Sequence, residues 1–153
     1  FKEKRVAYNG VTRTPKLVGH AREIVNWSRI TGVPLWLALG QCWRESQWFT
    51  TGLSINYNCG WGIKDGYGKW GTLGNPISVG GYSNYVSVSE AIGAYYKLMS
   101  DPTRPYKALI AAGDDASIRR ALNIYAPLFE NNGEQHWAIV ATVRGWLNTR
   151  GIK

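Results

Sequence analysis

The chain has 153 residues, of which 44% are hydrophobic and only 18% are charged. This composition excludes an intrinsically disordered chain and fits one compact domain over residues 1–153. The formal net charge is +8, and a basic surface attracts polyanions such as nucleic acid, anionic membranes or cell-wall polymers. No run of Lys and Arg exceeds two residues, which argues against the basic arm or stripe typical of a nucleic-acid partner.

Aromatic residues are unusual in number, with eight Trp and nine Tyr against three Phe. Trp and Tyr combine flat apolar faces with a polar group, so they stack well on sugar rings, although core packing explains about half of such residues as well. No apolar run reaches the ~20 residues of a membrane span. The chain starts at Phe rather than Met, which favours a processed product or an excised domain.

The two cysteines, Cys42 and Cys59, form no CxxC pair, and the two histidines, His20 and His136, lie far apart in the sequence. The sequence therefore predicts no metal or cofactor site and no Ser–His–Asp triad. A Cys42–Cys59 disulfide and two buried free thiols are both compatible with the pattern.

The N-terminal half predicts an irregular lead-in over residues 1–13, followed by two helices. Thr14-Pro15 is a typical helix start, apolar residues then recur at helical spacing, and Gly32 ends the helix. A second helix runs from Pro34 to about Ser46. Because residues 33–42 carry no charge, this helix is expected to be buried on all sides.

The segment 52–85 differs in composition, since nine glycines are mixed with Trp, Tyr and Asn. It predicts loops and short hairpins rather than helix. Four helices are expected after it: one from the capping box at residues 87–90 to Asp101, one over 106–112, one capped by Asp114 or Asp115, and one over 133–148. The expected fold class is α+β, mainly α, with about six helices and a small Gly- and aromatic-rich irregular or β lobe. A ligand cleft is expected between the two parts.

Glu45 is the most informative single residue, because it follows the uncharged helix and stands near its C-terminus. Apolar surroundings and the negative end of the helix dipole both favour the protonated carboxyl group. A glycosidase needs such a group to deliver a proton to the glycosidic oxygen. A Glu that merely ends a helix in solvent is the equally weighted alternative.

A glycosidase usually uses a second carboxylate, and the candidates are Asp65 and Glu130. Asp65 lies in the glycine-rich lobe and would face Glu45, although a turn residue before Gly66 is the simpler interpretation. Tyr125, at the end of a helix, is a candidate for orienting the sugar or stabilising positive charge, with a buried structural Tyr as the alternative.

Four short motifs, in chain order, carry a resemblance. Residues 43–48 (WRESQW) resemble the Glu-Ser signature of lysozyme-like peptidoglycan hydrolases. Residues 58–64 (NCGWGIK) resemble the Asn-Leu-Phe-Gly-Ile-Lys stretch of bacterial β-N-acetylglucosaminidases of glycoside hydrolase family 73. Residues 82–98 are similar to that family's next segment, and residues 125–132 (YAPLFENN) resemble a segment of related wall-lytic domains.

The resemblance covers about residues 15–148 and implies a lysozyme-like fold that cleaves β-1,4 bonds between GlcNAc and MurNAc in peptidoglycan. It implies Glu45 as the acid and Tyr125 as a residue lining the active site; Asp65, named above from its place in the lobe, is the other expected catalytic residue. The implied substrate contacts are Ser46, Trp61, Tyr82 and Asn131. The implied protein is a monomer that is secreted, wall-associated or part of a phage virion, and binds glycan strands without inserting into a membrane.

Two features depart from that family. Residues 71–85 contain no acid where many glucosaminidases carry a second Glu, and Cys59-Gly60 is an insertion relative to the usual motif. Either Asp65 substitutes for the missing acid, or the enzyme works with one acid and the substrate's N-acetyl group or 6-hydroxyl attacks. A muramidase, a lytic transglycosylase and a non-catalytic wall-binding module are therefore the alternatives, and a nucleic-acid-binding domain is the least favoured.

Overall fold

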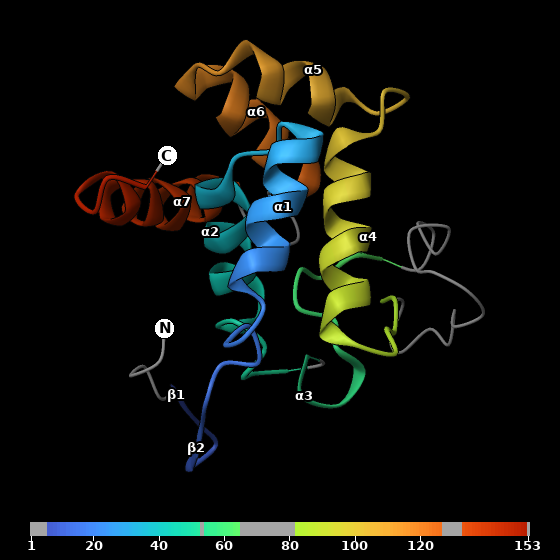
Figure 1. The fold of residues 1–153 in the computed structure, drawn as a ribbon, viewed down its shortest axis with the longest axis vertical. Coiled ribbons are helices and arrows are strands. Elements are labelled where there is room, and N and C mark those ends of the chain that lie inside the picture. Colours follow the sequence, from blue (N-terminus) through green and yellow to red (C-terminus); the bar gives the residue numbers. More distant parts are fainter. Residues whose placement is uncertain (1–5, 53, 65–81, 127–132, 153) are drawn as a thin grey trace.

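The computed structural model describes residues 6–52, 54–64, 82–126 and 133–152 (Figure 1). Over these residues the protein is mainly helical, with seven helices and one two-stranded hairpin. The strands are β1 (Val6–Tyr8) and β2 (Val11–Arg13); the helices are α1 (Ala21–Thr31), α2 (Leu35–Ser46), α3 (Ser54–Tyr57), α4 (Val88–Ser100), α5 (Pro105–Ala112), α6 (Asp115–Tyr125) and α7 (Gly133–Asn148). No helix in the described ranges is both long and apolar enough to cross a membrane.

The N-terminal segment is not wholly irregular, and the prediction for residues 6–13 is wrong. β1 and β2 pair in antiparallel fashion, with Tyr8 opposite Val11. The two residues between them, Asn9 and Gly10, have φ values of 49° and 73°. Positive φ at both central positions is the type I′ turn whose twist suits a two-residue hairpin, and Asn-Gly is its strongest sequence signal.

Helix α1 begins later than predicted. Residues 16–19 form a separate turn, in which the Val18 N–H donates to the Pro15 carbonyl, and Gly19 interrupts the path with φ of 100°. The helix starts only after this glycine, at Ala21. Its predicted end is confirmed, because Gly32 adopts a left-handed conformation and its N–H donates to the Ser28 carbonyl.

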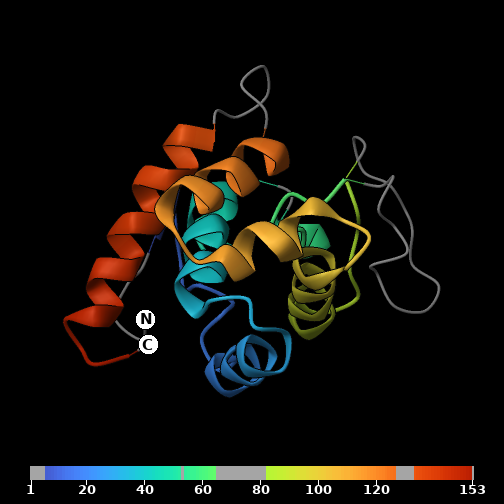
Figure 2. The same ribbon diagram turned by 90° about the horizontal axis from the view of Figure 1, so that it is seen from above.

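Helix α2 is the buried helix that the sequence predicts, with Pro34 as its N-cap and all of residues 37–42 buried. It packs most extensively on α7 and also contacts α1 (Figure 2). The α2–α7 crossing is close at Gly40, where an added Cβ would lie 2.7 Å from the Val140 Cα. A glycine is required there because backbone, rather than a flexible side chain, occupies the space.

The remaining helices end largely where the sequence predicts. Ser87 caps α4 by accepting a hydrogen bond from the Glu90 N–H, and Asp114, rather than Asp115, caps α6 through the Ser117 N–H. Glu90 reaches back to the Val86 N–H at 2.7 Å, so the reciprocal half of the capping box lies one residue further out than usual. Helix α5 ends at Gly113, as predicted.

The glycine-rich lobe is described at its two ends only. Its first part contains the four-residue helix α3, which the sequence analysis missed. The two described parts of the lobe meet in an antiparallel bridge between Lys64 and Tyr82. A 2.8 Å hydrogen bond from the Ser83 N–H to the Ile63 carbonyl reinforces this bridge. The predicted loops and hairpins of residues 65–81 lie outside the described residues.

We predict that Gly40→Ala lowers the free energy of unfolding by about 1–3 kcal/mol, because the new methyl group forces α2 and α7 apart. Gly145→Ala is the matched control, because Gly145 lies within α7, the other helix of this crossing, and an added Cβ there meets nothing within 4 Å. The control is expected to be neutral or stabilising by up to about 1 kcal/mol, as for Gly replaced by Ala in a helix. Urea unfolding of both variants measures the difference, and equal stability would show that the crossing tolerates a side chain.

Candidate active site

Glu45 lies in the last turn of α2, and its side chain is only 13% exposed. The helix ends directly after it, at Ser46, with Gln47 in a left-handed conformation. One carboxylate oxygen, Oε1, lies 3.2 Å from Nε2 of His136 on α7. The other, Oε2, faces the backbone of Gly62. The carboxyl group is therefore enclosed on two sides and keeps only a small exposed area.

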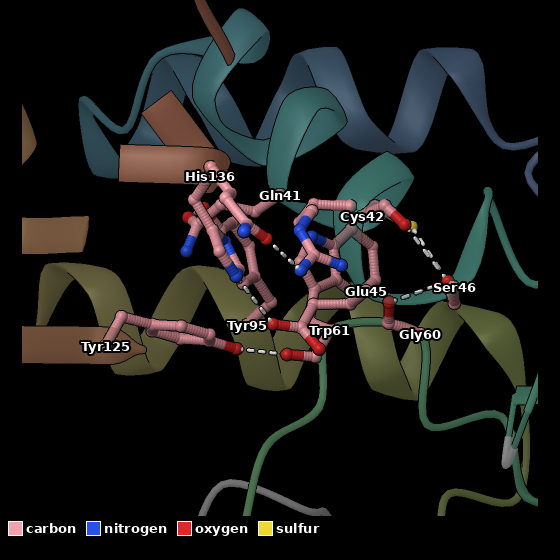
Figure 3. Close-up of polar contacts among 11 residues, drawn as sticks. Gln41, Cys42, Glu45, Ser46, Gly60, Trp61, Tyr95, Tyr125 and His136 are labelled. Atoms are coloured by element: carbon pink, nitrogen blue, oxygen red, sulfur yellow. Dashed lines mark hydrogen bonds and ion pairs between the residues drawn. The ribbon is translucent and has the colours of Figure 1, made fainter. Parts of the chain in front are cut away.

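The loop 59–63 passes beneath the last turn of α2 and is held there by three hydrogen bonds. The Ser46 hydroxyl donates to the Gly60 carbonyl at 2.7 Å, and the Trp61 indole N–H donates to the Ala38 carbonyl at 2.9 Å. The Tyr125 hydroxyl donates to the Trp61 carbonyl (Figure 3). These bonds come from α2 on one side and α6 on the other, so they fix the loop relative to Glu45.

Gly62 is the part of this loop that lies against the acid. Its φ is 63°, a conformation that glycine adopts without strain, and an added Cβ would lie 2.8 Å from Glu45 Oε2. A side chain at this position would therefore occupy the space next to Oε2. The glycine therefore allows the loop backbone to approach that oxygen closely.

Tyr125 is close enough to Glu45 to feel its charge, and its hydroxyl is engaged with the Trp61 carbonyl; its predicted role toward a sugar stays a prediction. Burial, and to a smaller extent the neighbouring charge of Glu45, raise the pKa of Tyr125 well above its ordinary value. The hydroxyl therefore stays protonated and acts as a donor. Its ring centroid lies 6.5 Å from that of His136, so Tyr125 and His136 approach Glu45 from the same side (Figure 3).

The other six carboxylates of the described residues are engaged away from Glu45. Their partners are His20 for Glu23, the Val86 N–H for Glu90, Thr103 for Asp101, Ser117 for Asp114, Arg144 for Asp115 and Arg119 for Glu134. The predicted second catalytic groups, Asp65 and Glu130, lie outside the described residues, and so does the predicted substrate contact Asn131.

Two predicted substrate contacts have structural roles instead. Ser46 is 2% exposed and bonds the loop and the Phe49 N–H, and the Trp61 side chain is 1% exposed and stacks on Tyr95 in the core. Both predictions are wrong because the sequence motif does not reveal that these side chains point inward. Tyr82 is partly exposed and pairs with Lys64 in an isolated bridge, and its contact with a ligand stays a prediction.

Both cysteines are buried free thiols, so the structure selects the second of the two alternatives. Burial raises the pKa of Cys59 to about 11, although hydrogen bonds from the Gly62 and Ile63 backbone N–H groups oppose the shift. Burial also raises the pKa of Cys42, and the charge of Glu45 adds to both shifts. These thiols pack the region around the carboxyl group and are not nucleophiles at neutral pH.

The sequence analysis missed His136 and Gly62. Ninety-one positions separate His136 from Glu45, and no local spacing connects them. The Gly62 signal was present in the sequence as a glycine within a family-like motif, but its reason, the approach of Glu45 Oε2, is tertiary. No cluster of three or more His, Cys, Asp or Glu side chains suited to a metal ion occurs in the described part of the chain.

Comparisons with protein-family models, with curated proteins and with solved structures found no match for this chain.

We predict that Ser46→Ala destabilises the protein by about 1–3 kcal/mol, because it leaves the buried Gly60 carbonyl and Phe49 N–H without their partner. Ser100→Ala is the matched control. Both hydroxyl oxygens lie close to the carbonyl oxygen four residues earlier, at 3.1 Å for Ser46 and 2.7 Å for Ser100, but only the Ser46 hydroxyl donates its proton to a distant loop, at the Gly60 carbonyl. A thermal-unfolding comparison is expected to show a clearly larger loss for Ser46→Ala, and equal losses would mean that the loop does not depend on Ser46.

The thiols provide a second test. A thiol with a pKa of about 11 has about 100-fold less thiolate at pH 8 than one at the ordinary value of 9.0, so native protein should react slowly with a disulfide reagent, and urea should release two thiols. Because the pKa of Cys59 is higher in the folded than in the unfolded protein, the folded protein binds more protons between about pH 9 and 11. The stability contributed below pH 9 is therefore lost as pH rises through this window. Rapid labelling of both native thiols would contradict the burial.

Proposed function

We propose that the protein is a glycoside hydrolase that cuts bacterial peptidoglycan, with Glu45 as its general acid. The observation that carries the proposal is the placement of the Glu45 carboxyl group. It is largely enclosed, its Oε1 lies 3.2 Å from His136 Nε2, and its Oε2 faces the backbone of Gly62, where no side chain covers it. A glycosidase acid needs such a held and partly desolvated carboxyl group with one oxygen accessible.

In the proposed reaction, Glu45 donates its proton to the glycosidic oxygen. The bond between that oxygen and the anomeric carbon breaks, the leaving sugar carries the proton away, and positive charge develops at the anomeric carbon. The resulting Glu45 carboxylate then accepts a proton from the attacking water. Tyr125 supports this step indirectly, since its hydroxyl holds the Trp61 carbonyl and thereby the loop that lies against the acid.

The second group of the mechanism is assigned by elimination. Six of the nine other acids in the chain are engaged away from Glu45, and Asp65 and Glu130 are the sequence candidates that remain. Asp65 is preferred, because it stands three positions after Gly62 in the chain and Gly62 lies against Glu45. If neither acid takes part, the substrate's own N-acetyl group or 6-hydroxyl attacks the anomeric carbon.

Peptidoglycan is the proposed substrate for two reasons. The four sequence motifs resemble those of lysozyme-like hydrolases, most closely the glucosaminidases of glycoside hydrolase family 73, and a lysozyme-like fold is part of the proposal. The net charge of +8 would also concentrate the protein on anionic wall polymers. We propose an endo-acting glucosaminidase that works as a monomer outside the cytoplasm or within a phage virion.

Cleavage by a muramidase or a lytic transglycosylase would use the same acid and differs in the products. Tandem mass spectrometry of borohydride-reduced digests separates the three: fragmentation locates the reduced end on GlcNAc after glucosaminidase cleavage and on MurNAc after muramidase cleavage, whereas the anhydro-MurNAc of a lytic transglycosylase lacks one water and is not reduced. Asp65→Asn joins this experiment: loss of activity is expected if Asp65 supplies the second carboxylate, and retained activity together with anhydro products would indicate the single-acid route.

We predict that Glu45→Gln abolishes clearing of a peptidoglycan suspension, with at least a 10²-fold loss of rate, because general acid catalysis contributes about 10²–10⁴. Glu134→Gln is the matched control, since it makes the same chemical change at an exposed Glu whose partner is Arg119. The control is expected to keep full activity and stability.

Clearing by Glu45→Gln at the wild-type rate would remove Glu45 from the mechanism. Wild-type protein that pellets with the wall but releases no product would replace the enzyme with a non-catalytic wall-binding module.

A further inference from the structure

His136 is a fully buried imidazole that the catalytic scheme above leaves without a task. It lies near the start of α7 with 0% of its side chain exposed. Neither ring nitrogen makes an aligned hydrogen bond within the described residues, although Nε2 lies 3.2 Å from Glu45 Oε1. A buried polar group without a partner costs about 1–3 kcal/mol, so an imidazole in this place needs a reason beyond packing.

The helix crossing places this imidazole, and the placement is rigid. Residues four apart share one face of a helix, so His136 lies on the face of Val140 and Glu45 lies on the face of Gln41. Val140 packs directly on the α2 backbone at Gly40, and one turn earlier in α7 His136 lies against Glu45. Gln41 is itself fixed, since its Oε1 accepts a 2.5 Å hydrogen bond from the Tyr95 hydroxyl.

The position of the proton on the imidazole ring, at Nε2 or at Nδ1, decides whether His136 donates a hydrogen bond to Glu45 or accepts one. With the proton on Nε2, the ring donates to Oε1 both when Glu45 is a neutral acid and after it has become a carboxylate. With the proton on Nδ1, that N–H is buried without an acceptor among the described residues, and Nε2 must accept the acid's own proton from Oε1. The second arrangement directs the reactive proton toward α7, away from the Gly62 side.

We propose that His136 is the positioning residue of this site: its Nε2–H donates to Glu45 Oε1, so that Oε2, beside Gly62, carries the proton delivered to the substrate. This inference rests on the proposed glycosidase function. A donor at Oε1 also stabilises the negative charge that Glu45 gains as its proton leaves, and its benefit is therefore greatest in the transition state. Hydrogen bonds of this kind are often poorly aligned without substrate and tighten when it binds.

Two substitutions separate positioning from packing. His136→Gln retains an N–H donor on a side chain of similar reach, and His136→Phe retains the ring without a donor. We expect His136→Gln to keep kcat within about tenfold of wild type, and His136→Phe to lower kcat by about 10²–10³ with little change in KM, the usual effect of removing one preorganised donor. A purely structural role would instead lower Tm while leaving kcat of the folded protein unchanged.

A second measurement does not depend on activity. The chain has two histidines, and within the described residues each has one carboxylate neighbour: His136 with Glu45, and the partly exposed His20 with Glu23 at 2.9 Å. Nitrogen NMR of ¹⁵N-histidine-labelled protein is expected to show His136 protonated on Nε2. Glu45→Gln should shift the His136 ring signals and leave those of His20 in place, and Glu23→Gln should do the reverse.

The inference is overturned by full kcat in folded His136→Phe, by an Nδ1-protonated His136, or by His136 signals that do not respond to Glu45→Gln. Wild-type protein without any activity on peptidoglycan would instead overturn the proposed function, and the NMR result would then decide the His136–Glu45 pairing. Should His136→Phe fail to fold, wild type and Glu45→Gln still give that decision.

Discussion

The attachment of the loop 59–63 to the last turn of α2 is the constraint on which the rest of the site depends. Ser46 and Trp61 bond the loop to α2, and Tyr125 bonds it to α6. Removing any of these bonds would leave a buried polar group without its partner, so they resist being exchanged for water. The Gly62 backbone consequently lies against one oxygen of Glu45, and the space beside that oxygen is a fixed part of the fold.

The close crossing of α2 and α7 is the second constraint, and it acts on the other oxygen. Gly40 allows the two helix backbones to approach, and His136 of α7 lies against Glu45 of α2. The carboxyl group is thus held between a loop from the glycine-rich lobe and a helix from the C-terminal half. Segments distant in the sequence enclose it, and this enclosure supports the proposal that Glu45 acts as an acid in a glycan-cleaving reaction.

Part of the aromatic richness, which first suggested sugar binding, serves the interior near this site. Trp61 stacks on Tyr95, Phe49 meets Trp61 edge-on, and Tyr95 meets Tyr96 edge-on. These rings bury large apolar areas, and the polar groups of Trp61 and Tyr95 are satisfied by the Ala38 carbonyl and by Gln41. Such a core gives the loop a rigid base, and sugar stacking in the proposed function falls to partly exposed rings such as Tyr82.

The sequence alone determined the elements whose signals are local. Periodicity and caps located α2, α4, α5 and α7 closely, because a proline, a Ser or Asp cap and a left-handed glycine act within one turn of the chain. It also singled out Glu45, since an uncharged helix ending in a carboxylate is visible in a single segment. The Asn9-Gly10 hairpin carried an equally local signal that the analysis overlooked. Tertiary structure decided the rest: that Ser46 and Trp61 point inward, that Gly62 must lack a side chain, and that His136 meets Glu45. Each depends on the approach of segments 14 to 91 residues apart, and the packing that brings them together leaves no periodic trace in the chain.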